Sequence, residues 1–203
     1  MESSTVAQPA TMAEGAATLV DCFHHTARTY PDRVAIRTKG DAVSITWAEL
    51  RERADDLAGG LAKLGLGRGD TIALMMGNRP EFHICDLAAM TLGATPFSIY
   101  QTFSPEQIEY VVSDAGARVA IVEQALLPAF LEARKSLPGL EHLIVVDGEA
   151  PEGTIPLSEV EGSNPDFDAE AAAAAVSPDA APTQIYTSGT TGPPKGVQLT
   201  HAN

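Results

Sequence analysis

Patterns of buried strands alternate with patterns of amphipathic helices through most of this chain. Residues 71–76 (TIALMM) read as a strand buried on both faces, because their apolar side chains do not alternate with polar ones. Further strands are expected at 95–99, 118–122 and 142–146, with helical segments between them. Repeated strand–helix units place parallel strands side by side, joined by right-handed crossovers. The expected fold class is therefore α/β, a layered and mostly parallel sheet with helices on both faces.

Several helix starts carry their own signals. Thr46 and Glu49 form a capping box, T-x-x-E, and Ser104 and Gln107 form a second one with proline at the first helical position. A first helix is expected from Thr18 to about residue 30, ended by the proline at 31, with one inward face. The residues expected on that face are Leu19, Phe23 and Ala27. Segments 34–37 and 43–46 flank a turn-forming cluster and predict a hairpin.

The segment 147–182 differs from the rest in composition. It contains five prolines and a run of alanines, and no Lys or Arg occurs between Lys135 and Lys195. We expect a long acidic surface connection with short helices near 156–160 and 168–175, the second of them exposed.

Residues 1–16 are small and polar, carry no Lys or Arg, and lack the apolar core of a secretory signal. They are expected to form a flexible tail.

Charge excludes one class of partner. The 203 residues hold 13 Lys and Arg against 27 Asp and Glu, a formal net charge of −14. Such a surface repels phosphate backbones, so nucleic acid is not an expected partner.

The two cysteines, Cys22 and Cys85, are too far apart in sequence to suggest a disulfide framework or a metal motif. No apolar run is long enough for a transmembrane segment. A cytoplasmic location, or a peripheral one at the membrane, is expected.

The segment with the clearest chemistry follows a short strand at 183–186. Residues 187–192 (TSGTTG) are all small or hydroxyl-bearing. Gly189 and Gly192 allow backbone N–H groups to approach phosphate oxygens closely. Hydroxyl donors come from Ser188, Thr190 and Thr191. Lys195 is the only positive charge after the long acidic stretch and can neutralise β and γ phosphates.

Two other interpretations of this segment fit its residues less well. A Walker A loop requires Gly-Lys-Ser/Thr, whereas Lys195 stands between proline and glycine, which disfavours a P-loop NTPase. A flexible loop with one solvated lysine would need no function at all. The complete string from Tyr186 to Gly196 favours phosphate binding over both.

The string from Tyr186 to Gly196 resembles the signature of the adenylate-forming superfamily, which includes acyl-CoA synthetases, luciferases and peptide adenylation domains. Four other blocks, at 44–50, 69–80, 92–94 and 113–116, resemble the same family. The stretch 96–107 (PFSIYQTFSPEQ) is similar to long-chain fatty-acid–CoA ligases. Two alternatives stay open: an amino-acid or aryl-acid adenylation domain, and a non-catalytic nucleotide-binding module.

The resemblance implies a reaction in two halves. A fatty-acid carboxylate attacks the α phosphate of ATP, and the thiol of coenzyme A then displaces AMP from the acyl-adenylate. It implies that the loop holds the β and γ phosphates and that Mg²⁺ bridges them, with Thr187 near the metal. The cofactor-binding residues are then Thr187, Ser188, Gly189, Thr190, Thr191, Gly192 and Lys195.

The resemblance also implies a division of the chain and a limit to its activity. Residues 17–203 would be part of an N-terminal AMP-binding domain, with the phosphate loop at 186–196. Family members are longer, so the adenine pocket, the acyl tunnel and the catalytic lysine would lie outside these residues. We therefore expect no catalytic residue within this chain, and no activity from the chain alone.

The histidines, Cys85 and Trp47 give weaker indications of function. His24 and His25 are adjacent on a helix and point in different directions, so joint metal binding is not expected. His83 and Cys85 are expected to serve packing or surface roles, and Trp47 to pack. His201 is expected to have a structural role near the loop.

Overall fold

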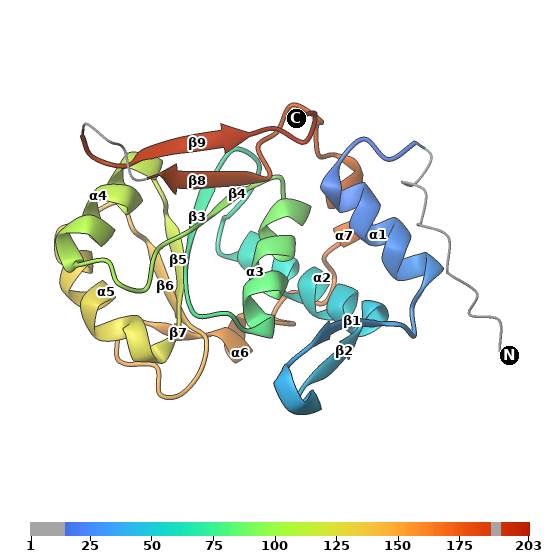
Figure 1. Ribbon diagram of the computed structural model, residues 1–203, viewed down its shortest axis with the longest axis horizontal. Helices are drawn as coiled ribbons and strands as arrows, with labels where there is room; N and C mark the ends of the chain where they lie inside the picture. Colours follow the sequence, from blue (N-terminus) through green and yellow to red (C-terminus); the bar gives the residue numbers. More distant parts are fainter. Residues whose placement is uncertain (1–14, 188–191) are drawn as a thin grey trace, which may run out of the picture.

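A computed structural model describes residues 15–187 and 192–203 and confirms the α/β fold (Figure 1). Within these residues a seven-stranded sheet has the order β7-β6-β5-β3-β4-β8-β9. Its strands are β3 (Thr71–Met75), β4 (Thr95–Ser98), β5 (Val119–Val122), β6 (His142–Val145), β7 (Ile155–Pro156), β8 (Thr183–Thr187) and β9 (Lys195–Leu199). All neighbouring strands of the sheet are parallel except β8 and β9. A separate antiparallel hairpin joins β1 (Val34–Arg37) to β2 (Ser44–Thr46), as predicted.

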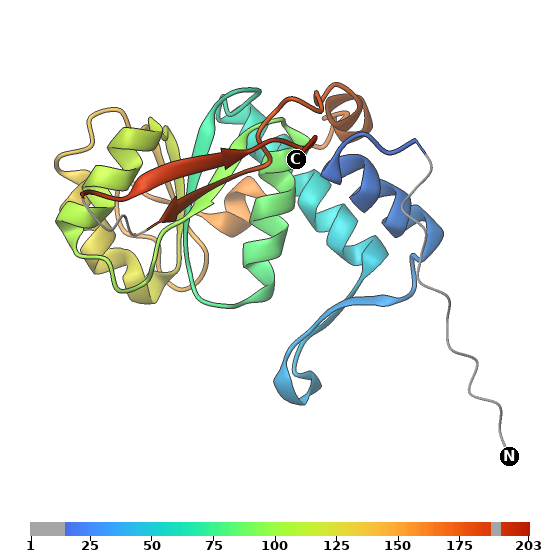
Figure 2. The same ribbon diagram turned by 45° about the horizontal axis from the view of Figure 1, so that its top comes forward.

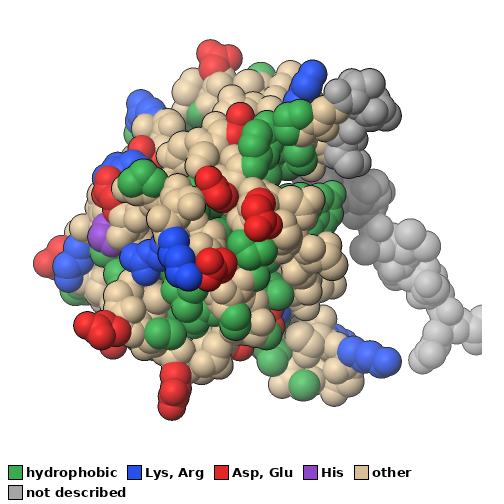
Figure 3. Space-filling model, turned by 90° about the vertical axis from the view of Figure 1, so that its left-hand side faces the viewer, with side chains coloured by type: hydrophobic (Ala, Val, Ile, Leu, Met, Phe, Trp, Pro, Cys, Tyr) green, Lys and Arg blue, Asp and Glu red, His purple; other side chains and the backbone are tan. Residues whose placement is uncertain are grey.

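Two hydrophobic cores lie on the two faces of the sheet. Ile72 and Leu74 of β3 contribute to one core, with α2 (Trp47–Lys63) and α3 (Pro80–Thr91). Ala73 and Met75 contribute to the other, with α4 (Pro105–Ala115) and α5 (Leu127–Arg134). The alternation of side chains along one strand therefore supplies both layers. The outer surface of the α4–α5 end carries acidic, basic and apolar side chains intermixed (Figure 3), and Figure 2 shows how the β8–β9 hairpin runs along one side of the molecule.

Both predicted capping boxes are formed, at the starts of α2 and α4. A third box, which was not predicted, begins α1 (Leu19–Thr29), where the backbone N–H of Asp21 donates to Thr18 Oγ1 over 3.0 Å. The predicted burial of one side chain was wrong. Leu19 is 52% exposed, whereas Val20 and His24 are buried together with Phe23 and Ala27. Because α1 packs against α2, α3 and α7, its inward face is rotated away from its first residue.

The segment 147–182 forms both short helices that were predicted, α6 (Leu157–Val160) and α7 (Ala169–Ala174). It is more than a surface connection, because it also adds β7, which pairs with β6, and because Leu157 and Val160 of α6 are buried. The alanine helix α7 (Ala169–Ala174) was predicted to be exposed, but Ala169 and Ala173 are buried. Its small side chains allow the short helix to approach α1 and α3 closely.

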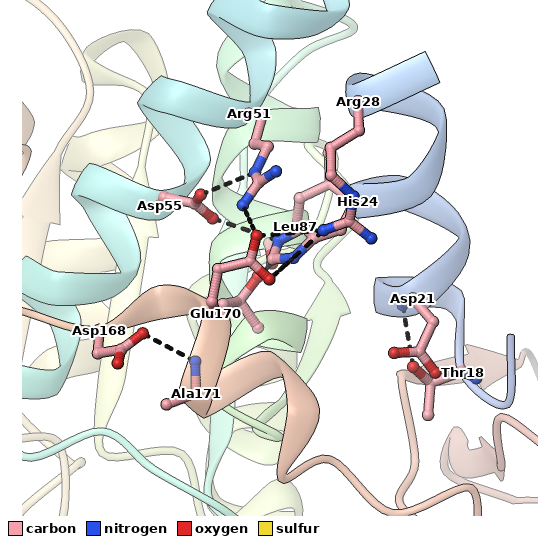
Figure 4. A network of polar contacts seen from close by, with 11 residues as sticks. Thr18, Asp21, His24, Arg28, Arg51, Asp55, Leu87, Asp168, Glu170 and Ala171 are labelled. Atoms are coloured by element: carbon pink, nitrogen blue, oxygen red, sulfur yellow. Dashed lines mark hydrogen bonds and ion pairs between the residues drawn. The ribbon is translucent and has the colours of Figure 1, made fainter. Parts of the chain in front are cut away.

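A cluster of charged side chains fixes α7 against α1 and α2 (Figure 4). Glu170 of α7 forms ion pairs with Arg28 of α1, over 3.1 Å, and with Arg51 of α2. Arg51 also pairs with Asp55 over 3.2 Å, and Nε2 of the buried His24 lies 3.4 Å from Asp55. The hydrogen bond from Arg51 lowers the pKa of Glu170. Three helices that are distant in sequence are therefore joined through one carboxylate.

Candidate phosphate-binding hairpin

The predicted phosphate loop joins two strands, β8 and β9. The prediction placed a strand at 183–186 and extended the loop to Gly196. The structure instead places Lys195 and Gly196 inside β9, paired with Thr187 and Tyr186 of β8. Ser188, Gly189, Thr190 and Thr191 lie outside the described residues, so their prediction as phosphate ligands stays a prediction.

The hairpin brings two predicted site residues together. Thr187 and Lys195 are directly opposite each other in the ladder, and both are exposed. Directly opposite residues of an antiparallel pair have their side chains on the same face. A hydroxyl and an ammonium group therefore share one open face beside the loop. Gly192 is also exposed, and among the described residues no atom lies within 4 Å of the place where its Cβ would stand.

The opposite face of the hairpin is anchored to α4. The hydroxyl of the buried Tyr186 donates to Asp114 Oδ2 over 2.8 Å and accepts from Gln184 Nε2 over 2.9 Å. Burial, the hydrogen bond with Asp114 and its negative charge together raise the pKa of Tyr186. On the far side of the loop, the Tyr110 hydroxyl donates to the carbonyl oxygen of Pro194 over 3.0 Å. Both ends of the loop are thus held by side chains from one helix.

Gly196 is required by this anchoring. A Cβ at position 196 would lie 2.5 Å from Gln184 Nε2 and 3.2 Å from Tyr186 Cζ. The side chain of Tyr186 therefore packs over the backbone of β9 where Gly196 leaves room. The sequence analysis identified Gly196 as part of a signature. It did not identify the residues that anchor the hairpin, which are Gln184, Tyr110 and Asp114. Gln184 and Asp114 both hydrogen-bond to the Tyr186 hydroxyl, and Tyr110 donates to Pro194, so these contacts join positions that the sequence alone does not bring together.

A hollow of about 580 Å³ lies against α4. Its lining residues are Glu106, Glu109, Tyr110, Ser113 and Asp114. Three carboxylates make this hollow unfavourable for a triphosphate. The face that carries Thr187 and Lys195 has the charge that phosphate requires.

A scan against protein families matches residues 23–203 to the family of AMP-binding enzymes. The chain belongs to this family. An uncharacterized protein of Mycobacterium tuberculosis is 41% identical over 150 residues, which cover 74% of this chain and 80% of that protein. A long-chain-fatty-acid–CoA ligase of Mycobacterium bovis is 34% identical over 206 residues, which cover 100% of this chain and 34% of the ligase. The 4-coumarate–CoA ligase 3 of Oryza sativa is 35% identical over 160 residues, covering 78% of this chain and 27% of that ligase.

Solved structures agree with the family. An anthranilate CoA ligase in complex with anthranoyl-AMP superposes with a TM-score of 0.84 at 27% identity, covering 91% of this chain and 35% of that one. A long-chain-fatty-acid-CoA ligase from Archaeoglobus fulgidus gives a TM-score of 0.77, also at 27% identity, covering 91% of this chain and 36% of that one. This AMP-binding chain therefore spans about a third of the length of the CoA ligases that it matches.

The remaining candidate residues of this family member lie away from the hairpin loop. His83 is exposed, whereas Cys85 is fully buried, and burial raises the pKa of its thiol. His201 was predicted to lie near the loop, which is wrong: it follows the far end of β9, where its Nδ1 accepts from the N–H of Leu19 over 3.1 Å. Trp47 packs as predicted, its ring centroid 6.4 Å from that of Phe23.

Two absences apply to residues 15–187 and 192–203 only. Over these residues, no three or more His, Cys, Asp and Glu side chains gather as a metal site would require. In the same part of the chain, no helix combines the length and the apolar character needed to cross a bilayer.

Proposed function

We propose that this chain supplies the triphosphate-binding hairpin of an AMP-forming acid–thiol ligase that acts on long-chain fatty acids, with ATP and coenzyme A as co-substrates. One observation carries the proposal: the paired, exposed side chains of Thr187 and Lys195, beside a loop whose two ends are anchored to α4. The cytoplasm is the proposed location, since ATP and coenzyme A are substrates there.

Lys195 is the residue that binds the negative charge of the phosphates in this proposal. Its ammonium group would neutralise oxygens of the β and γ phosphates as pyrophosphate leaves. The carboxylate of a fatty acid is already nucleophilic, so this half of the reaction depends on positioning and charge neutralisation. The backbone N–H groups of 188–191, with the hydroxyls of Ser188, Thr190 and Thr191, are proposed to cradle the same phosphates.

Thr187 is proposed as the residue nearest to magnesium. The hydroxyl is exposed and lies on the face of Lys195, which fits a hard oxygen ligand beside phosphate. Held near Thr187, magnesium would neutralise part of the negative charge of the phosphates. Thr187 offers a single oxygen, so the other ligands would come from ATP, water and groups outside the described residues.

We further propose that residues 17–203 act as part of a larger AMP-binding domain and that the chain alone does not catalyse acyl-adenylate formation. The CoA ligases that it matches are about three times as long, which supports this view. The similarity to a 4-coumarate–CoA ligase keeps an aryl-acid substrate as the second candidate. Acyl specificity would be set by residues outside this chain.

Titration of the chain with MgATP, followed by NMR of backbone amides, tests the hairpin. We expect weak, millimolar binding that shifts the resonances of Thr187, Gly192 and Lys195, because one loop without a base pocket restricts the ligand little. Lys195→Gln should abolish these shifts. Lys39→Gln, which removes an exposed lysine from the β1–β2 turn, should leave them unchanged. Shifts confined to other parts of the chain would contradict the proposal, and micromolar affinity would favour a nucleotide-binding module.

A chimera tests the ligase activity itself. This chain would replace the matching third of the Mycobacterium bovis ligase, and acyl-CoA formation from palmitate would be measured. We expect activity that falls on the order of a hundredfold with Lys195→Gln in the chimera, as for loss of a group that stabilises developing charge. An active chimera that tolerates Lys195→Gln would show that the hairpin does not hold the triphosphate.

A further inference from the structure

A groove of about 440 Å³ is lined by residues of α1, α3, β1 and the start of α2. Its walls are mostly apolar and include Leu19, Phe23, Ile36, Trp47, Leu87 and Met90. The groove is at the end of the molecule occupied by α1 and β1, away from the loop end of the β8–β9 hairpin (Figure 1). Its volume is in the range of small-molecule sites. Nothing in the proposed ATP chemistry uses it.

One carboxyl group is placed among these apolar walls. Asp86 of α3 lines the groove and, among the described residues, has neither a hydrogen-bond partner nor an ion-pair partner. Burial alone raises the pKa of Asp86 to about 7. Asp55 shows the contrast, because that partly buried carboxylate is paired with Arg51. A half-buried acid that lines a groove with no Lys or Arg among its lining residues is the feature that calls for a partner.

We propose that this groove binds a small amphiphile with an apolar body and a protonated amine, and that Asp86 is the counter-ion of the amine. An ammonium group supplies N–H donors and the charge that the isolated carboxylate lacks. The Trp47 ring also lines the groove and can attract a cation, and the apolar walls bind the body of the ligand. The net charge of −14 also concentrates cations near the surface.

Other ligand classes fit the same groove less well. A fatty acid or a phosphate would bring a second negative charge to Asp86. A neutral alcohol could accept a hydrogen bond from the protonated acid but would gain no ionic attraction. The other titratable groups that line the groove are Cys22 of α1 and His83 of α3. The inference is independent of the phosphate hairpin, because it uses none of the hairpin residues.

Trp47 allows a direct test, because it is the only tryptophan in the chain and lines the groove. The intact chain is titrated at pH 8 with octylammonium, octanol and octanoate while tryptophan emission is recorded. We expect a saturable change with octylammonium and at least tenfold weaker binding of octanol and octanoate. Affinity should rise between pH 6 and pH 8 as Asp86 ionises, since the alkylamine stays protonated there.

Two variants separate the specific site from general charge. Asp86→Asn should weaken octylammonium binding at least tenfold and leave octanol binding unchanged. Glu52→Gln removes an exposed negative charge from α2, near the same end of the molecule, and should change neither affinity. Thermal unfolding followed by circular dichroism checks that both variants fold.

Cys22 gives a second readout that does not depend on fluorescence. The thiol of Cys22 lines the groove, whereas Cys85 is fully buried, so a thiol reagent should modify Cys22 first. Octylammonium should slow that modification in the wild type and not in Asp86→Asn.

The proposal is overturned if octylammonium gives no saturable response, or if Asp86→Asn binds it as well as the wild type. Equal binding of octanoate or octanol would equally reject a cation site. Emission and Cys22 protection that change with protein concentration, and not with amine, would assign the groove to a second copy of the chain and also overturn it.

Discussion

The phenol of Tyr186 donates a 2.8 Å hydrogen bond to the carboxylate of Asp114, and this bond ties the strand before the phosphate loop to helix α4. The residues lie 72 positions apart in sequence. Since Tyr186 is followed directly by Thr187, the bond sets where the first proposed phosphate ligand stands.

Loss of this bond should loosen the hairpin. Tyr186→Phe removes the donor to Asp114 and the acceptor of Gln184 and keeps the ring packed against Phe97. We expect the free energy of unfolding to fall by roughly 1–3 kcal/mol, as for buried polar groups left without partners. Urea unfolding measures this change in the free energy of unfolding. Tyr110→Phe breaks only the bond to Pro194 and should cost about 1 kcal/mol. Equal stability of Tyr186→Phe and wild type would show that the bond is not formed.

Gly196 should tolerate no side chain. In Gly196→Ala the new methyl group would meet Gln184 and Tyr186, so we expect a loss of about 1–3 kcal/mol in the free energy of unfolding. Gly192→Ala serves as the matched control, because its methyl group would meet no atom within 4 Å, and it should unfold like the wild type. Similar losses in both variants would mean that glycine is needed in the hairpin for reasons other than packing.

Asp86 should make stability fall as pH rises. Its pKa is about 7 in the folded chain and near 3.8 ordinarily, so the folded state binds the proton more tightly. Below about pH 4 both states are protonated; between pH 4 and 7 the folded state loses relative stability, and above pH 7 the loss is complete. Asp86→Asn removes this term, so the variant should gain roughly 1–4 kcal/mol over wild type between pH 4 and pH 8. A constant difference across that range would show that Asp86 is not desolvated.

His201 should give stability the opposite dependence on pH, so that stability falls as pH falls. Its Nδ1 accepts from Leu19, and burial lowers the pKa of the imidazole below its usual 6.5. A lowered folded pKa gives stability that is present above pH 6.5 and is lost as pH falls through the folded value. His201→Phe should therefore be destabilised near pH 7.5, with the difference shrinking toward pH 5. His201→Gln keeps an acceptor and should recover part of the loss.

Amide hydrogen exchange of Leu19 provides the local measurement for this contact. Exchange should accelerate in His201→Phe and not in His25→Gln, which changes an exposed histidine of the same helix. Unchanged exchange at Leu19 would show that His201 does not cap α1.

Local signals in the sequence predicted most of the fold. The strand at 71–75 was predicted because a strand covered on both faces is apolar throughout, and the helix at 105–115 because its capping box is complete in four consecutive residues. β7 was missed because it is two residues long and ends in proline. β9 was missed because its lysine and glycine follow two prolines and read as loop.

The candidate site was predictable only in part. Thr187, Gly192 and Lys195 stand in one short string, so residue chemistry was enough to select them. Asp114 and Tyr110 act across 72 and 84 positions, and no local pattern links them to the hairpin. Asp86 was one carboxylate among many until the structure placed it in the same groove as Trp47 and Met90.

The contacts that hold α1 have a consequence for synthesis. Arg28 meets Glu170 across 142 positions, and Leu19 meets His201 across 182. A ribosome releases the nearer partners of α1, which are α2 and α3, soon after α1 itself, whereas Glu170 and His201 emerge much later. Contacts at such sequence separation form slowly. α1 can therefore pack early against α2 and α3, but its two ends, at Leu19 and Arg28, are fixed only after residues 201 and 170 have been synthesised, and nascent chains that lack these residues should be cut by proteases within α1 before they are cut in the sheet.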